Sequence, residues 1–188
     1  TKRSVNFYVI HGGTNFGFTA GANAFSPTAY QPDITSYDYD APINEQGQPT
    51  AKYFMLRNLI SKYSATPLPA IPAPQKVIYV QEIPMKRVQS IWDVLPAPVT
   101  SPQPLPMEML DQNQGLMLYR TELIGHKSGK LTIWEPHDYA LVFLDGVFID
   151  TVFRDGGKWT VDLPKTTNTQ NPVLDILVEG MGHINFAQ

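Results

Sequence analysis

The sequence of 188 residues predicts an α/β unit followed by an all-β domain. An apolar run from Ser4 to Ile10 ends at two glycines, which is typical of a buried strand. Apolar residues at helical spacing follow Thr50, so a helix is expected there. From Gly115 onward, short apolar and β-branched runs alternate with turn signals. That pattern favours a β-sandwich or jelly roll.

Composition excludes several classes of partner. The net charge is −3 and the sequence pI is about 5.7, so the chain carries no basic field that would attract nucleic acid or an anionic membrane surface. No apolar run approaches the roughly twenty residues that span a bilayer. The chain has no cysteine, which excludes disulfides and thiol catalysis within it. We therefore expect neither nucleic-acid binding nor membrane insertion.

The predicted first strand leads into a long segment that ends near Thr50. We expect roughly forty residues of loop without secondary structure, and loops of that length are usually functional. Its first motif, HGGTNFG at residues 11–17, is rich in glycine. It lacks the Lys-Ser/Thr pair of a P-loop and the spacing of a dinucleotide fingerprint, so phosphate binding is rejected. The glycines are expected to let the backbone turn sharply.

A helix is predicted to begin after Thr50, which is a suitable N-cap residue. Its apolar stripe is expected to pack against a core and not to bind a ligand; the stripe consists of Leu56, Leu59, Ile60 and Tyr63. Four prolines between Ser64 and Pro74 then predict a semi-rigid, extended linker.

The remaining chain is predicted to be mostly β-structure after two connecting elements. A strand is expected at Val77–Val80, a short helix at Met85–Leu95, and a proline-rich connector at Pro96–Pro106. Asp145-Gly146 is a strong two-residue hairpin signal, and Asp155-Gly156-Gly157 predicts a second turn. Further strands are predicted at Leu116–Leu123, Lys130–Trp134, Tyr139–Leu144 and Trp159–Leu163.

Tyrosine and aspartate alternate at residues 37–40. In an extended backbone both tyrosines would face one way and both carboxylates the other. Tyrosine offers a sugar ring an aromatic face and a hydroxyl partner. Asp38 and Asp40 do not fit a catalytic pair, because side chains at i and i+2 of one strand project in parallel and cannot flank a substrate. They are expected to brace the loop, while Tyr37 and Tyr39 pack beneath it or contact substrate.

Three motifs in this order carry a resemblance: HGGTNFG at 11–17, SYDYDAP at 36–42 and KYFMLR at 52–57. Together with the preceding apolar run, they resemble the end of the catalytic barrel of glycoside hydrolase family 35, the β-galactosidases. The stretch from Leu174 to Phe186 resembles the first β-sandwich domain of the same family.

The resemblance implies a fold and a division of the chain. Residues 1–63 would form the last βα unit of a (β/α)8 TIM barrel, residues 64–75 the linker, and residues 76–188 a β-sandwich or jelly-roll domain with a galactose-binding-like fold, possibly incomplete. A complete barrel needs about 250 residues, so the chain is expected to be a fragment of a larger protein.

The resemblance also implies an activity, that of a retaining exo-β-galactosidase acting on terminal β-linked galactose of oligosaccharides or glycans. Both catalytic glutamates are expected to precede Thr1, and neither Glu45 nor Glu82 is assigned to either role. The substrate-binding residues implied are Tyr39, Tyr37, Asn15 and Phe16. No cofactor or metal is expected. A secreted or periplasmic location is expected, and the lack of an Asn-x-Ser/Thr sequon favours a bacterial source.

The alternative is a non-catalytic carbohydrate-binding or structural β-sandwich module. Four aromatic residues in the β-rich part would form its sugar platform, although such residues more often lie in a core: Trp134, Trp159, Tyr139 and Phe153. The histidines at 126, 137 and 183 do not have metal-ligand spacing, so no zinc or calcium site is expected.

Overall fold

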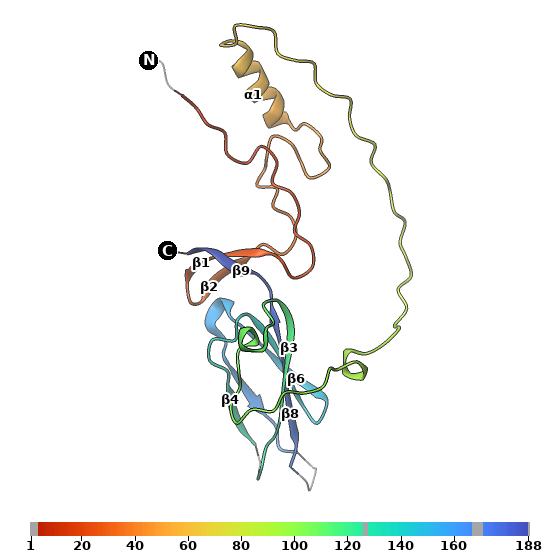
Figure 1. The fold of residues 1–188 in the computed structure, drawn as a ribbon, viewed down its shortest axis with the longest axis vertical. Coiled ribbons are helices and arrows are strands. Elements are labelled where there is room, and N and C mark those ends of the chain that lie inside the picture. Colours follow the sequence, from red (N-terminus) through yellow and green to blue (C-terminus); the bar gives the residue numbers. More distant parts are fainter. Residues whose placement is uncertain (1–3, 126–127, 167–170, 188) are drawn as a thin grey trace. The chain divides into compact units, whose positions relative to one another are not determined.

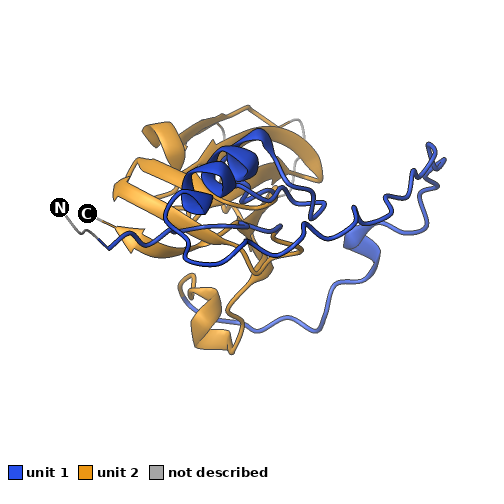
Figure 2. Ribbon diagram, turned by 90° about the horizontal axis from the view of Figure 1, so that it is seen from above, with its two compact units in different colours: residues 1–14, 36–102 blue, residues 15–35, 103–188 orange. Residues whose placement is uncertain are grey.

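The computed structural model describes residues 4–125, 128–166 and 171–187 (Figure 1). These residues form two compact units (Figure 2). The first unit contains Thr1–Thr14 and Ser36–Pro102, and the second contains Asn15–Thr35 and Gln103–Gln188. The long segment between the predicted strand and the helix is therefore divided between both units.

The helix of the first unit, α1 (Ala51–Ser61), confirms the predicted start at Thr50. The Thr50 side chain accepts a hydrogen bond from the Tyr53 amide at 3.5 Å, which satisfies one of the free N–H groups of the first turn. No residue of α1 is buried, and most of its apolar residues are exposed to solvent, with Leu56 half-buried. The predicted packing of the stripe against a core is not realised among the described residues.

The prediction of a buried strand from Ser4 to Ile10 is wrong for this chain. The segment has no regular secondary structure, and nearly all of it is exposed. Only its end is paired, where the Ile43 amide donates to the carbonyl of Ile10 at 3.0 Å and His11 bridges Ile43 in parallel. A strand needs a neighbour to satisfy its backbone groups, and the described residues offer none alongside 4–10.

Residues 64–75 contain neither helix nor strand, and the extended region reaches well beyond them (Figure 1), while their role as a linker between domains stays a prediction. The predicted strand at Val77–Val80 is wrong, because these residues are exposed and pair with no strand in the described part of the chain. The predicted helix at Met85–Leu95 is reduced to the single turn η1 (Ile91–Asp93). Ser90 caps this turn, and the Asp93 carboxylate accepts from the Ser90 amide in return.

The second unit is a β-structure with three sheets. A four-stranded antiparallel sheet has the order β3-β8-β5-β6, a two-stranded sheet pairs β4 with β7, and a three-stranded sheet has the order β2-β1-β9. The elements are β1 (Gly21–Ser26), β2 (Ala29–Pro32), η2 (Met107–Leu110), β3 (Gly115–Glu122), β4 (Gly129–Thr132), β5 (Tyr139–Leu144), β6 (Val147–Phe153), η3 (Asp155–Gly157), β7 (Thr160–Leu163), β8 (Val173–Gly180) and β9 (His183–Ala187).

One hydrophobic core joins the four-stranded and two-stranded sheets. Ala140 and Val142 of β5 alternate inward, and Val161 of β7 meets them from the smaller sheet. All strands predicted after Gly115 are confirmed within two residues at each end. The Asp145-Gly146 hairpin is also confirmed, with φ of 49° and 75° at its two residues, as a type I′ turn requires.

The long segment is not without secondary structure, so that prediction is wrong. It contains the antiparallel hairpin β1–β2, and β1 also pairs in parallel with β9 at the far end of the chain. The buried positions of β1 are Ala22 and Ala24. Alanine carries little hydrophobic signal and is depleted in strands, which explains why periodicity did not indicate this hairpin.

Candidate functional site

The two motifs of the long segment are paired through their backbones within the first unit. Thr14 bridges Ser36 in antiparallel fashion, and the Tyr37 amide donates to the Gly13 carbonyl at 2.9 Å. Gly12 lies directly against the Tyr37 backbone, because a Cβ added at residue 12 would fall 1.5 Å from the Tyr37 carbonyl oxygen. The absent side chain of Gly12 thus lets HGGTNFG support the tyrosine segment.

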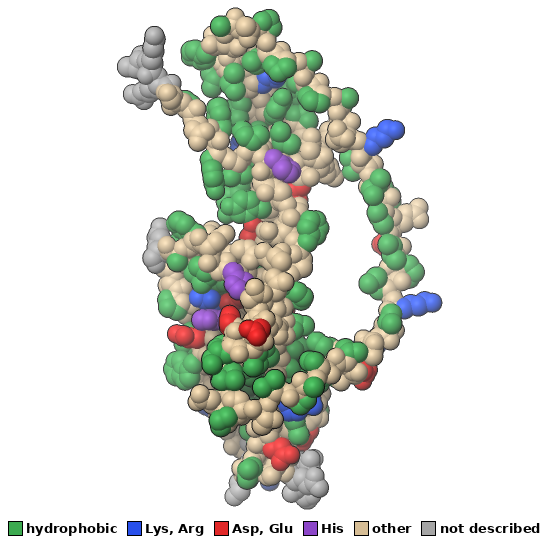
Figure 3. Space-filling model, in the orientation of Figure 1, with side chains coloured by type: hydrophobic (Ala, Val, Ile, Leu, Met, Phe, Trp, Pro, Cys, Tyr) green, Lys and Arg blue, Asp and Glu red, His purple; other side chains and the backbone are tan. Residues whose placement is uncertain are grey.

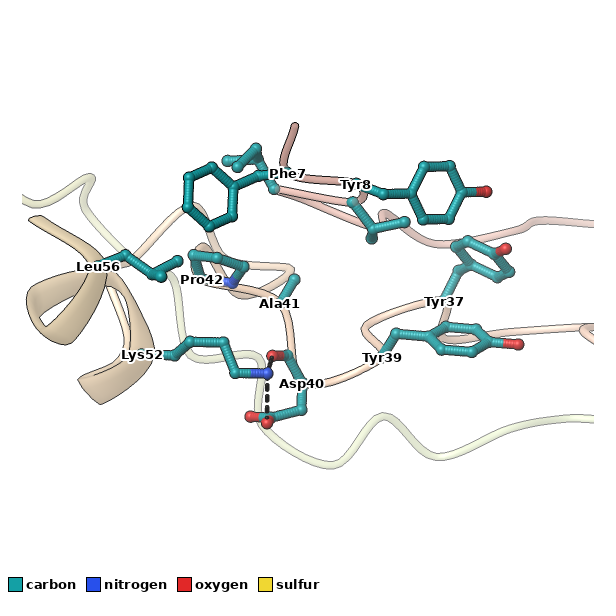
Figure 4. A pocket seen from close by; sticks show the side chains of 11 residues that line it. Phe7, Tyr8, Tyr37, Tyr39, Asp40, Ala41, Pro42, Lys52 and Leu56 are labelled. Carbon is teal, nitrogen blue, oxygen red and sulfur yellow. Dashed lines mark hydrogen bonds and ion pairs between the residues drawn. The ribbon is translucent and has the colours of Figure 1, made fainter. Parts of the chain in front are cut away.

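Tyr37 and Tyr39 form a ring pair with centroids 4.6 Å apart and planes inclined by 54° (Figure 4). The predicted extended backbone is wrong here, because Tyr39 and Asp40 have φ of 51° and 52°. The turn nevertheless brings both rings to one side, with their hydroxyls pointing the same way in Figure 4. Tyr39 is 65% exposed, and none of the described residues hydrogen-bonds to its hydroxyl. An exposed ring with an adjacent hydroxyl can stack on a sugar and bind its hydroxyl groups.

The two aspartates of this motif brace the loop, as predicted. The Asp38 carboxylate accepts from the Ala41 amide at 3.3 Å, next to a backbone hydrogen bond between the same two residues. The Asp40 carboxylate pairs with Lys52 Nζ at 2.6 Å, which ties the turn to α1 (Figure 4). Both partners of this ion pair are largely exposed, so its contribution to stability is at most about 1 kcal/mol.

A cavity of about 330 Å³ opens beside the tyrosine pair. It has an aromatic and polar end, formed by the tyrosines and the Asp40–Lys52 pair, and an apolar end near α1 (Figure 4). Its lining residues come from the first unit alone: Phe7, Tyr8, Val9, Ile10, Tyr37, Tyr39, Asp40, Ala41, Pro42, Lys52 and Leu56.

Glu45 is the third acidic residue near the paired motifs. Hydrogen bonds from the Ser36 and Thr14 hydroxyls, with a further one from the Tyr37 amide, lower the pKa of Glu45 below its usual range. Its carboxylate thus stays charged at neutral pH and connects both motifs. These contacts give Glu45 a supporting role in the loop.

Asn15 and Phe16 belong to the second unit, so the structure brings together only two of the four predicted substrate-binding residues. The Asn15 amide donates to the Thr35 carbonyl at 2.7 Å, and its side-chain amide donates to the Asp33 carbonyl at 2.6 Å. These bonds close the base of the segment between the motifs. The Phe16 ring is exposed.

No group of three or more His, Asp or Glu side chains in the described ranges is placed to hold a metal ion. His126 of the predicted scattered histidines lies outside those ranges. Among the helices that the structure describes, none is both long enough and apolar enough to cross a membrane.

Comparison with known proteins gives matches in both the N-terminal and the C-terminal part of the chain. Residues 1–63 match the glycosyl hydrolases family 35, and residues 104–188 match the first all-beta domain of beta-galactosidase. The chain is 37% identical to a beta-galactosidase of Xanthomonas manihotis, covering 97% of this chain and 31% of that protein. It is 40% identical to beta-galactosidase 17 of Arabidopsis thaliana, and the match covers 97% of this chain and 29% of that protein. It is also 40% identical to a human beta-galactosidase, and that match covers 97% of this chain and 27% of the human protein.

These matches show that the chain is similar to glycoside hydrolases. More specifically, residues 1–63 match glycoside hydrolase family 35, the family whose motifs the sequence resembles, and residues 104–188 match the first all-beta domain of beta-galactosidase. The chain spans only 27% to 31% of the length of these three relatives.

Sequence reasoning missed the supports of the tyrosine pair. Gly12 was expected to serve a sharp turn, but the positive φ values occur at Gly13 and Gly17, 89° and 60°, and Gly12 instead permits close backbone approach. The Asp40–Lys52 pair spans twelve residues and has no local signature. The sequence indicates this pair only weakly, through an acidic residue in the loop and a lysine in the first turn of the predicted helix.

Proposed function

We propose that the protein containing this chain is a retaining exo-β-galactosidase that removes terminal non-reducing β-D-galactose from oligosaccharides or glycans. The observation that carries this proposal is the Tyr37–Tyr39 ring pair beside the cavity, in which Tyr39 is exposed and its hydroxyl is available to a ligand. In the proposed complex the Tyr39 hydroxyl hydrogen-bonds galactose. We propose Asn15 and Phe16 as further substrate-binding residues.

The chemistry requires two carboxyl groups about 5–5.5 Å apart, one as acid/base and one as nucleophile. The acid protonates the leaving oxygen while the nucleophile attacks the anomeric carbon, and water then releases galactose from the covalent intermediate. The three acids near the site are already engaged in bracing the loop: Asp38, Asp40 and Glu45. We assign both catalytic groups to glutamates outside this chain.

The exposed apolar surfaces of the first unit support a TIM-barrel origin. Hydrophobic side chains gather around α1 and around segment 4–10 (Figure 3). Val5, Phe7 and Ile10 are exposed on that segment, as are Leu59 and Ile60 on α1. Exposure of so many large apolar groups is typical of a surface that another element covers. We propose that the other βα units of the barrel cover it.

A secreted or periplasmic location completes the proposal, with a bacterial source favoured by the absence of a glycosylation sequon. The galactoside is the only partner that the proposal requires.

Replacing Tyr39 with Phe in the full-length protein is expected to lower kcat/KM for nitrophenyl β-D-galactoside about tenfold, since one hydrogen bond to the sugar is lost while the ring remains. Steady-state kinetics on purified variants measure this change. Tyr79→Phe is the matched control, because Tyr79 is an exposed residue of the extended region. Equal kinetics for wild type and Tyr39→Phe would contradict the role of Tyr39.

A second candidate function is carbohydrate binding by the β-domain, favoured by one observation. Trp134 was expected in a core but is 75% exposed, and its ring meets the edge of Trp159 at a centroid distance of 5.5 Å. Such a ring can stack on a sugar. If this site binds galactose, Trp134→Ala in the full-length protein removes one of two binding events seen by calorimetry. A single event that Trp134→Ala leaves unchanged would exclude this function.

A further inference from the structure

The hairpin β1–β2 lies between the two sugar-site motifs in the sequence, yet it is anchored in the β-domain. Tyr30 of β2 is among the most buried large side chains of the second unit, with 2% exposure. Its contacts are made with residues more than a hundred positions further along the chain. The hairpin is therefore part of the packing of the second unit.

The Tyr30 hydroxyl is the centre of a buried polar network. It lies 2.7 Å from an Asp138 carboxylate oxygen and 2.7 Å from the Gly182 carbonyl, and it accepts from the Gly182 amide at 2.8 Å. The single hydroxyl proton is donated to one of the two oxygens at a time. The Met181 amide donates to the same Asp138 oxygen at 3.2 Å. Tyr30 thereby joins the hairpin to the turn before β9.

Arg154 supplies the counter-charge of this network. Its Nη1 donates to the other Asp138 carboxylate oxygen at 3.1 Å, and its guanidinium carbon lies 4.9 Å from the centre of the Tyr30 ring. Asp138 is 5% exposed and Arg154 9%. Burial and the neighbouring Asp138 carboxylate raise the pKa of Tyr30 far above its usual range, so the hydroxyl remains neutral. A buried charge pair of this kind is costly to break, because either partner alone would be an unpaired buried ion.

Two further contacts fix the turn and the backbone of the hairpin. The Gly156 amide of η3 donates to the Thr28 carbonyl at 3.1 Å, and the Tyr30 amide donates to the Asp155 carboxylate at 3.3 Å. At its base, the Asn15 amide is bonded to the Thr35 carbonyl. The rest of the β-domain therefore holds segment 15–35 at its turn, along β2 and through the pairing of β1 with β9, while the two ends of the segment are bonded to each other.

We propose that Tyr30, Asp138 and Arg154 are positioning residues for the sugar site. They fix segment 15–35. The two ends of this segment are joined directly to Thr14 and Ser36, which pair with each other and belong to the two motifs. This inference rests on the proposed function only for the effect on galactoside kinetics. The predicted anchoring of segment 15–35 stands independently of any activity. A misplacement of about 1 Å at a reacting site can cost a factor of 100, so a remote anchor can control the kinetics.

Tyr30→Phe in the full-length protein tests the proposal, because it keeps the ring over Arg154 and removes only the hydroxyl. Tyr119→Phe is the matched control, since the Tyr119 hydroxyl donates to the Leu105 carbonyl at 2.8 Å, which lies outside segment 15–35. We expect Tyr30→Phe to speed amide hydrogen exchange in residues 15–35 about tenfold and to raise KM for nitrophenyl β-D-galactoside about tenfold. Tyr119→Phe leaves both unchanged.

The two measurements separate the possible failures. Unchanged exchange in 15–35 would overturn the anchoring, whatever the activity. Faster exchange with unchanged KM, or with a fall in apparent kcat alone, would show a merely structural role and overturn the positioning claim. Absence of galactosidase activity in the wild-type protein would refute the proposed function instead. If Tyr30→Phe does not fold, Asp155→Ala removes only the contact with the Tyr30 amide, and the same two measurements decide the proposal.

Discussion

Replacing Asp138 with Asn is expected to destabilise the β-domain by about 3–5 kcal/mol, because Arg154 then becomes an unpaired buried charge. The side chains of Asp138 and Arg154 are only 7% and 11% exposed, so water cannot replace the lost partner. The amide also has a donor group where the carboxylate accepts from both Tyr30 and Met181. Native-state hydrogen exchange of the full-length protein, read at the amides of β5 and β8, reports the stability of this domain.

Asp162→Asn is the matched control in the same domain. Asp162 also forms an ion pair, with Lys130 Nζ at 2.8 Å, but both side chains are largely exposed. Water and salt screen such a pair, so its removal is expected to cost no more than about 1 kcal/mol. Similar losses for Asp138→Asn and Asp162→Asn would show that the buried network contributes no more than a surface pair.

The parts of the fold that the sequence predicts correctly are those with local causes. Thr50 caps α1 through its own side chain, and Asp145-Gly146 has the two positive φ angles that its hairpin requires. The strands after Gly115 are short runs rich in apolar and β-branched residues, separated by turn signals, and they find partners within the same domain. Each of these signals acts over a few residues, so no distant partner is needed to interpret it.

The errors have a common physical cause, which is dependence on distant partners. Residues 4–10 have the composition of a buried strand, but without neighbouring strands among the described residues they remain extended and exposed. β1 shows the reverse case, since its alanines give a weak signal and its pairing with β9 supplies the missing neighbour. Likewise, the tyrosine motif predicts a sugar-contacting surface, whereas the turn geometry at Tyr39 depends on the contacts of its neighbours with Gly12, Gly13 and α1.

Gly12→Ala in the full-length protein is expected to lower kcat/KM for a β-galactoside by a factor of about 100, because the new methyl group cannot coexist with the observed backbone of residue 37. The added Cβ would lie 1.5 Å from the Tyr37 carbonyl oxygen and 3.3 Å from the Asp38 Cα. Both neighbours are backbone atoms, so the two paired motifs have to separate. That separation breaks the hydrogen bond between Tyr37 and Gly13 and displaces the ring pair.

Gly129→Ala is the control for a general effect of replacing glycine, because a Cβ there meets no atom within 4 Å. It is expected to keep the wild-type kcat/KM. Tyr39→Phe separates position from chemistry: it removes the hydroxyl and keeps the loop, so its effect should be smaller than that of Gly12→Ala. If Gly12→Ala retained full activity with the protein folded, the close pairing of the motifs would not be needed for the sugar site. A larger loss of kcat/KM for Gly12→Ala than for Tyr39→Phe would mean that Gly12 positions more than one sugar contact. Tyr37 and Tyr39 would then be displaced together.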